Sequence, residues 1–232
     1  MNKDLSRNAE GWDDSHEAYH QIMDAIVTQK LAPSQKVSEN IFADLFGISR
    51  SISRNLIEQL TAKHFLISVS PRVTQVAPLT LMEIKQNFML RKILLPEAFA
   101  LAAPKVDFNA LSRLAEDIEE MLPIEDDEIA LKVLKANKRL NLLAVEKTGY
   151  PLMSDWIEQL EDTAMRIYWL YIKINKSFFY SQEQMEMTIS IMKNDEPGRT
   201  RQMMHDILTQ TEDRILNSIF SQEQFYSQDL KI

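Results

Sequence analysis

Apolar residues recur at helical spacing along most of the chain. The first such segment is Ser15–Gln29, whose apolar positions share one helix face: Tyr19, Ile22, Met23 and Ile26. Beyond residue 80 the same pattern predicts further helices and no strand. Their ranges are Leu81–Ala103, Asn109–Leu122, Asp126–Thr148, Met153–Asn175, Gln182–Asn194 and Gly198–Phe220. Proline, glycine and capping residues separate these ranges, so we expect a mainly α-helical fold.

The stretch between residues 38 and 78 departs from this pattern. Ser38–Leu60 predicts two short helices joined by a tight turn at Gly47. The sequence then alternates over Phe65–Ser70 and Val73–Val76 on either side of a proline turn, which predicts a small hairpin. Pro78 closes this unit, and the following threonine suits the start of a new helix. We therefore expect two domains, a winged helix-turn-helix over residues 1–78 and an all-helical bundle over residues 79–232.

The second short helix of this stretch has one apolar and one polar face. At about 100° per residue, Ile52, Leu56 and Leu60 fall on the apolar side. The polar side carries Arg50, Ser51, Arg54, Asn55, Glu58 and Gln59. An arginine fork can contact guanine, an asparagine amide can contact adenine, and a helix N-terminus can contact phosphate. A merely solvated face is the plainer alternative, but the preceding helix, the turn and the hairpin favour DNA recognition.

This region resembles the winged helix-turn-helix of GntR-family transcription regulators. The matching residues follow the family's order and spacing: Tyr19, Ile22, Ile26, Leu31, Pro33, Ser38, Glu39, Ala43, Phe46, Gly47, Ile48, Ser49, Arg50, Arg54 and Leu60. The resemblance implies these DNA contacts: Ser38, Ser49, Arg50, Ser51, Arg54 and the wing residue Arg72. Asn55 joins them through its place on the polar face.

Three positions depart from the GntR pattern. Ile52 stands where the family commonly has proline, Asn55 where it has glutamate, and Thr74 where the wing usually has glycine. Because the wing glycine affects how the wing enters the minor groove, its loss predicts an atypical operator preference.

The second domain resembles the all-helical ligand-binding domain of the FadR branch, called FCD. Arg91–Ala103 is similar to the signature of that domain's first helix, with Leu95 in place of the usual glutamate. Asn137–Asn141 followed by Gly149–Leu152 keeps the spacing of two further family motifs. The resemblance implies a homodimer that binds a palindromic DNA operator and a small-molecule effector.

Many FCD domains bind a divalent metal through one aspartate and three histidines. Here the corresponding positions are Asn137, Asn141, a third near Gln182 or Glu183, and His205. Neutral amides are poor ligands beside carboxylate and imidazole. With three of the four expected ligands replaced, we expect no metal cofactor. The two asparagines can instead hydrogen-bond a ligand or water, and His205 has a place either at the pocket or near the core.

An effector pocket without metal needs another group to hold an anion. Arg91 and Arg139 are candidates to hold a carboxylate, and Tyr168, Trp169 and Tyr171 are candidate pocket walls. The plainer alternative puts the aromatic residues in the core or a dimer interface and the arginines at the surface or between helices. The expected ligand-binding set is Arg91, Asn137, Asn141 and His205, with a carboxylate metabolite as the effector.

The net charge of the chain bears on the expected strength of DNA binding and leaves the predicted class of protein unchanged. The chain of 232 residues has a formal net charge of −8. Between Tyr19 and Pro78, six basic and four acidic residues give a charge of +2, which leaves −10 for the rest. A mildly basic segment on an acidic body is compatible with DNA binding through one small face and predicts weak nonspecific association.

Missing features narrow the class of protein further. The chain has no cysteine, which excludes disulfides and thiolate chemistry. It shows no glycine-rich phosphate loop, nucleophile elbow or His-Glu-x-x-His motif, so we expect no enzyme. It also shows no signal peptide and no apolar run of the roughly 20 residues that a membrane span needs. We expect a cytoplasmic protein.

Together these features predict a transcription regulator, and specifically a repressor, whose DNA affinity changes when a small molecule binds. Two alternatives stay open. One is a helical ligand- or protein-binding module that no longer reads DNA. The other is a DNA-binding regulator that has lost small-molecule sensing.

Overall fold

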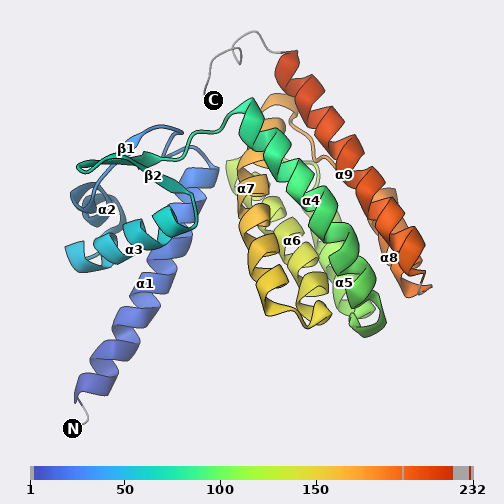
Figure 1. Cartoon of the computed structure of the whole chain (residues 1–232), viewed down its shortest axis with the longest axis horizontal. Coiled ribbons are helices and arrows are strands. Elements are labelled where there is room, and N and C mark those ends of the chain that lie inside the picture. The colour runs from blue at the N-terminus through green and yellow to red at the C-terminus, as the bar shows by residue number, and fades with distance from the viewer. Residues whose placement is uncertain (1–2, 195, 222–229, 231–232) are drawn as a thin grey trace. The chain divides into compact units, whose positions relative to one another are not determined.

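A computed structural model describes residues 3–194, 196–221 and 230 of the chain, with no side-chain detail for residues 3–14, 182 and 220. It confirms the mainly helical fold class, with a small sheet in the N-terminal part (Figure 1). Packing divides the chain between Leu79 and Thr80, where we expected a boundary after residue 78. The polar composition of residues 221–232 predicts a frayed end of the chain. Most of this range, residues 222–229 and 231–232, lies outside the described residues.

The N-terminal unit begins with helix α1, Lys3–Val27, which starts well before the predicted Ser15. Two short helices follow, α2 over Glu39–Phe46 and α3 over Arg50–Ala62, as predicted. Gly47 ends α2 at φ +67°, a left-handed conformation that glycine adopts without a steric penalty. The turn between the two helices therefore depends on this glycine.

A three-stranded antiparallel sheet completes the unit. Its strands are β1 at Lys36–Val37, β2 at Leu66–Ser70 and β3 at Val73–Val76, in the order β1-β3-β2. The β2–β3 pair is the predicted hairpin, with a register shift between Ser68 and Ser70. The sequence did not predict strand β1, because two residues are too few to show an alternating pattern.

The apolar faces of these elements form one core. Its largest buried members are Ile22, Ile26, Leu31, Phe42, Leu56, Leu60, Phe65 and Val76. Leu230 also belongs to this unit, since its backbone N–H donates to the Leu79 carbonyl at 2.8 Å and its carbonyl accepts from Gln29 Nε2 at 3.2 Å. The helix-turn-helix and the hairpin are thus held by a shared apolar interior.

The second unit consists of helices in the part that the structure describes. These are α4 at Leu81–Ala102, α5 at Phe108–Glu120, α6 at Asp127–Val145, α7 at Pro151–Asn175, α8 at Gln182–Lys193 and α9 at Pro197–Phe220. Helix α4 begins with a capping box formed by Thr80 and Glu83. Helix α7 begins at Pro151, before the predicted Met153, because proline suits the first helical position.

Helix α4 lies at the centre of this bundle. It packs against α6, α7 and α9, while α5 packs against α6 and α8 (Figure 1). The core between them includes Leu95, Phe99, Ile118, Val133, Val145, Ile157 and Leu208. Among the described helices, none has the length and apolar composition needed to cross a membrane.

Candidate DNA-binding surface and effector cavity

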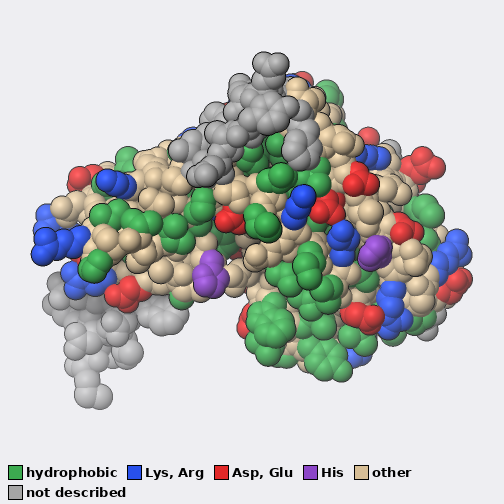
Figure 2. Space-filling view, turned by 45° about the horizontal axis from the view of Figure 1, so that its top comes forward, with side chains coloured by type: hydrophobic (Ala, Val, Ile, Leu, Met, Phe, Trp, Pro, Cys, Tyr) green, Lys and Arg blue, Asp and Glu red, His purple; other side chains and the backbone are tan. Residues whose placement is uncertain are grey.

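The seven residues that the sequence proposes as DNA contacts are all exposed on the N-terminal unit. We call them the recognition surface: Ser38, Ser49, Arg50, Ser51, Arg54, Asn55 and Arg72. The opposite face of α3 is buried through Ser53, Leu56 and Leu60. Figure 2 shows basic side chains gathered at one end of this unit. The predicted division of α3 into a packing face and a free polar face is therefore present.

Capping bonds set the start of both helices of the recognition surface. The Ser38 hydroxyl accepts from the Ile41 N–H at 3.3 Å, and the Ser49 hydroxyl accepts from the Ile52 N–H at 3.2 Å. Ser49 and Ser51 also share a hydroxyl–hydroxyl hydrogen bond of 2.9 Å. The serines thus fix where α2 and α3 begin, and they leave further backbone N–H groups at those ends for an anion.

Arg54 is paired with an acidic side chain of α2. Its Nε donates to Glu39 Oε1 at 2.7 Å and its second terminal nitrogen to Glu39 Oε2 at 3.2 Å. This hydrogen bond to Arg54 is the main cause that lowers the pKa of Glu39, and the same contact raises the pKa of Arg54. Within the described residues, Arg50 and Arg72 make no hydrogen bond or ion pair. The recognition surface therefore holds two uncommitted arginines and one arginine restrained by an acidic neighbour.

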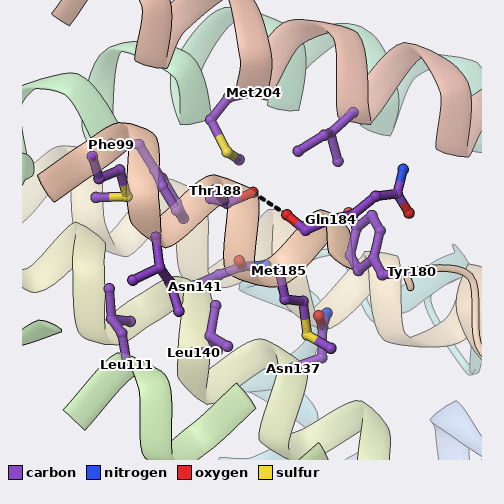
Figure 3. Close-up of a pocket in the computed structure, with 13 residues that line it drawn as sticks. Phe99, Leu111, Asn137, Leu140, Asn141, Tyr180, Gln184, Met185, Thr188 and Met204 are labelled. Atoms are coloured by element: carbon purple, nitrogen blue, oxygen red, sulfur yellow. Dashed lines mark hydrogen bonds between the residues drawn. The ribbon is translucent and has the colours of Figure 1, made fainter. Parts of the chain in front are cut away.

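The helical unit contains a cavity lined by α4, α5, α6, α8 and α9. Figure 3 draws the 13 residues that line it, and we call it the effector cavity: Phe99, Leu111, Asn137, Leu140, Asn141, Tyr180, Gln184, Met185, Thr188, Ile189, Met192, Met204 and Ile207. Its volume is about 40 Å³ when measured over the positions open to the centre of a water molecule. The lining contains no Lys, Arg, His, Asp or Glu. The cavity is thus apolar and uncharged, with a few polar groups.

Asn137 and Asn141 lie one turn apart on α6 and both line the cavity, as the sequence predicts. Figure 3 shows them below Gln184 and Thr188 of α8, with the Met185 side chain of α8 extending towards Asn137 in this view. Both are more than nine-tenths buried, with 4% and 7% of their surfaces exposed. Asn141 Nδ2 donates to Glu161 Oε2 at 2.9 Å. Asn137 has no hydrogen-bond partner among the described residues.

A buried charged network lies beside these asparagines. Arg91 Nε donates to Glu161 Oε1 at 2.9 Å, and a terminal nitrogen of Arg91 lies 2.8 Å from the same oxygen. Another terminal nitrogen of Arg91 donates to the Tyr168 hydroxyl. Arg91 and Glu161 are 0% and 1% exposed in their side chains, so their charges compensate one another away from water.

The pKa values in this network follow from burial and pairing. Burial alone would lower the pKa of Arg91, but attraction to Glu161 and to the tyrosine hydroxyls outweighs it and raises that pKa. Burial is the main cause that raises the pKa of Tyr168 and of Tyr180. At neutral pH the network therefore consists of one ion pair and two neutral phenols.

The structure separates Arg91 and His205 from the two asparagines. Arg91 does not line the cavity and its guanidinium is paired with Glu161, so the structure gives no support to the expectation that it holds a carboxylate. The His205 side chain is 52% exposed and lies outside the cavity lining, so neither a pocket nor a core position fits it. Arg139 pairs with Glu146 at 2.7 Å on the exposed surface.

The aromatic residues also differ from their predicted place. Tyr168 and Trp169 are buried core residues, which matches the plainer of the two sequence interpretations. The cavity wall comes instead from Tyr180 and from methionines of α8 and α9. Sequence reasoning missed this wall because a methionine on an amphipathic helix gives the same pattern in a core and in a cavity.

The residues at the family's metal positions do not suit a metal ion. Asn137 and Asn141 offer amides, and the exposed His205 is not among the residues around them. Within the described ranges, no group of three or more His, Asp or Glu is arranged to hold a metal ion. The donor set at the cavity is therefore one for hydrogen bonds.

Comparison with known families gives one match over more than half of the chain. The FCD domain matches residues 86–210, which include α5, α6, α7 and α8 and all residues of the effector cavity. Comparison with curated proteins finds no match.

Several solved structures share the fold over most of the chain. McbR/YncC of E. coli is 18% identical, with a TM-score of 0.73, 88% of this chain covered and 97% of that chain. A protein of Rhodococcus sp. RHA1, described as a GntR transcriptional regulator, is 12% identical with a TM-score of 0.69 and the same two coverages. A GntR family member from Pseudomonas syringae pv. tomato is 23% identical with a TM-score of 0.50, covering 90% and 89%. At these identities the likeness concerns the fold.

Proposed function

The chain belongs to the FCD-domain family and has the two-unit fold of GntR-type transcription regulators, and from this premise we propose that it is a cytoplasmic, sequence-specific DNA-binding regulator. In this proposal α3 enters the major groove of an operator, and the wing contacts the adjacent backbone or minor groove. The helical unit binds a small molecule that changes the DNA affinity. No catalytic step is part of this role.

The observation that carries the DNA-binding proposal is the exposure of the recognition surface. Arg50 and Arg72 are exposed and uncommitted, while the apolar positions of α3 are buried in the unit's own core. A polar helix face with arginines at its N-terminal end is the arrangement that base recognition in the major groove requires. The capped starts of α2 and α3 support contacts with phosphate.

Control by a small molecule is supported by the effector cavity. A ligand changes DNA affinity only if it binds one conformation of the protein more tightly than another. The cavity is lined by five helices of the bundle, so a ligand there can favour one packing of α8 over another. We propose a repressor that releases its operator when the effector binds. If a reporter gene under the operator loses expression on deletion of this protein, the protein is an activator instead.

We propose that two copies form a homodimer, which matches a palindromic operator. Supporting this, α4 and α7 pack together and carry exposed apolar side chains, with Met89 60%, Ile93 55%, Leu152 60% and Trp156 54% exposed. Figure 2 shows hydrophobic side chains gathered on a face of the helical unit. A charged substitution such as Ile93→Glu should shift the mass measured by light scattering from dimer to monomer.

We also propose that regulation needs no divalent metal. The amide character of Asn137 and Asn141 supports this. Elemental analysis of the purified protein should find no stoichiometric metal, and DNA binding should be the same after dialysis against EDTA. Loss of DNA binding on chelation, restored by added zinc or nickel, would overturn this point.

The experiment that tests the main proposal is a gel shift with DNA upstream of the protein's own gene, measured over a range of salt. The comparison is the Arg50→Ala/Arg54→Ala variant, with circular dichroism to verify its fold. Selective binding that falls steeply with salt and disappears in the variant is the expected result. A folded dimer that binds this DNA and random genomic fragments equally in both forms would contradict it.

The second candidate function is a binding module that no longer reads DNA. The specific observation in its favour is the bidentate Arg54–Glu39 pair, which occupies one of the two recognition-helix arginines. If the same double variant keeps the protein's effect on its target genes in the cell, the result would favour this second function over DNA binding.

A further inference from the structure

The effector cavity differs from a site built for an anion, and its polar groups indicate what it accepts. We propose that it binds a small uncharged molecule that carries a hydrogen-bond donor and acceptor side by side, as a primary amide or a lactam does, on an apolar body. This inference rests on the proposed effector role of the helical unit and names the chemical class of the effector.

The cavity lining provides no countercharge for an ionised ligand. All 13 lining residues are neutral, and most are Leu, Ile, Met or Phe. Moving a charge from water into such surroundings is unfavourable unless a partner of opposite charge is present. A neutral ligand avoids this cost and gains from the apolar contacts.

The buried positive charge of Arg91 is already neutralised. Arg91 contacts Glu161 through two of its nitrogens, at 2.9 and 2.8 Å, and contacts Tyr168 through a third. A carboxylate ligand that took Arg91 would leave the Glu161 carboxylate buried without its partner. The internal ion pair therefore acts against anionic ligands.

The same carboxylate fixes the orientation of Asn141. An ionised carboxylate only accepts hydrogen bonds, so the amide group that faces Glu161 Oε2 at 2.9 Å must be the nitrogen of Asn141. Its Oδ1 and its second N–H are left for other partners. Asn141 thus offers an acceptor to a group in the cavity.

Asn137 leaves its whole side-chain amide available for hydrogen bonds. It is 4% exposed, lines the cavity and has no hydrogen-bond partner among the described residues. A buried amide normally finds partners, because leaving it unpaired is unfavourable. An amide edge presents one donor and one acceptor together, and it is complementary to the amide edge of a ligand.

The other polar groups of the lining are used within the helical unit. Thr188 donates to the Gln184 carbonyl at 2.8 Å (Figure 3), and Gln184 Oε1 accepts from the Ser181 N–H at 3.1 Å. The Tyr180 hydroxyl interacts with Tyr168 and Thr211. Recognition therefore depends on the two asparagines.

The size of the cavity limits the ligand. A volume of about 40 Å³ has room for roughly three water molecules, at ~10–15 Å³ for each. A larger occupant must displace side chains, and Met185, Met192 and Met204 are the flexible ones. Ligand binding is thus coupled to repacking of α8 and α9.

Matched neutral and anionic probes test this proposal. Benzamide and benzoate have the same shape and differ in charge, as do acetamide and acetate. Each is titrated into full-length protein with 13C-labelled methionine methyl groups, assigned by substitution. The amides should shift Met185, Met192 and Met204 in a saturable way, while Met23 in the N-terminal unit stays unchanged and the carboxylates shift none of the three.

Two variants show whether Asn137 carries the recognition. Asn137→Leu keeps the volume and removes the amide, and it should weaken amide binding about tenfold, the effect of one or two hydrogen bonds. The matched control is Asn87→Leu, which removes another buried amide of the same unit outside the cavity. It should leave amide affinity unchanged.

Saturable carboxylate shifts at the cavity methionines, or no shift with any amide in a folded protein, would overturn the proposal. So would equal amide affinity in Asn137→Leu and the original protein. The gel shift is run on the same samples. Selective DNA binding without amide binding would leave the proposed function intact, whereas amide binding without DNA binding would leave the cavity assignment intact and remove the proposed function.

Discussion

The recognition surface and the effector cavity differ in where their charged side chains lie. At the recognition surface, Arg50 and Arg72 are exposed and Arg54 is held by a single exposed carboxylate. At the cavity, every lining side chain is neutral, and the nearby charges of Arg91 and Glu161 are buried against one another. Water screens charges at the first place, whereas the second place tolerates them only in pairs.

This difference indicates which residues a ligand can use. An exposed arginine keeps its hydration and can exchange water for phosphate or a base edge at little cost. A buried arginine that already has a carboxylate partner is part of the protein's own stability. Residue type alone therefore says little about a binding role, and the available partner decides it.

The largest expected effect comes from breaking the buried pair. Glu161→Leu leaves Arg91 uncompensated and should lower the free energy of unfolding by about 3–5 kcal/mol. Urea unfolding followed by Trp156 and Trp169 fluorescence, in a Trp12→Phe background, measures the helical unit. The Arg91→Met/Glu161→Leu double variant should recover most of the loss. If Glu161→Leu lowers the free energy of unfolding by less than ~1 kcal/mol, Arg91 and Glu161 do not form a buried ion pair.

The recognition surface should respond to substitution in DNA affinity and not in stability. Arg50→Ala should weaken operator binding by roughly 10- to 100-fold, since a bidentate arginine–base contact contributes about 1–3 kcal/mol. Fluorescence anisotropy with operator DNA measures this. Arg199→Ala, an exposed arginine of α9, is the control and should bind as the original protein does. Equal losses in both variants would point to a general charge effect.

Alkaline pH should lower the stability of the helical unit, which holds the buried tyrosines Tyr168 and Tyr180. The pKa values of Tyr168 and Tyr180 are raised in the folded protein, so their contribution to stability is complete below pH 10 and is lost as pH rises above it. The helical unit should lose stability by up to about 1.4 kcal/mol per pH unit for each tyrosine. Tyr168→Phe should show a shallower decline between pH 10 and 11 in the same fluorescence assay. An unchanged slope in that variant would assign the alkaline loss to other groups.

The smallest effect is expected at the exposed ion pair. Glu39→Gln removes a negative charge next to the recognition helix and releases Arg54. Nonspecific DNA binding should strengthen, with the slope of log affinity against log salt steeper by roughly one charge. Selectivity for the operator over random DNA should fall. Asp44→Asn, another acidic residue of α2, serves as the matched control, and an identical change there would remove any special role for Glu39.

The features that the sequence predicts correctly have local causes. The helix boundaries follow capping residues and glycine, as at Ser38, Gly47 and Ser49. The packing and free faces of α3 follow from the 3.6-residue period, which places Leu56 and Leu60 opposite Arg50 and Arg54. The short strand β1 and the early start of α1 were missed, because two residues and a polar helix give no periodic signal.

The sequence by itself determined the mainly helical fold class, the polar face of α3 and the shared α6 position of Asn137 and Asn141. Those features depend on residues a few positions apart. Only the tertiary structure decided that Glu161, 70 residues after Arg91, pairs with it, that Glu39 pairs with Arg54, and that His205 lies outside the cavity lining. The reason is physical: a side chain's partner across a helix bundle is set by packing between elements, and no local pattern encodes which opposite charge will be nearest.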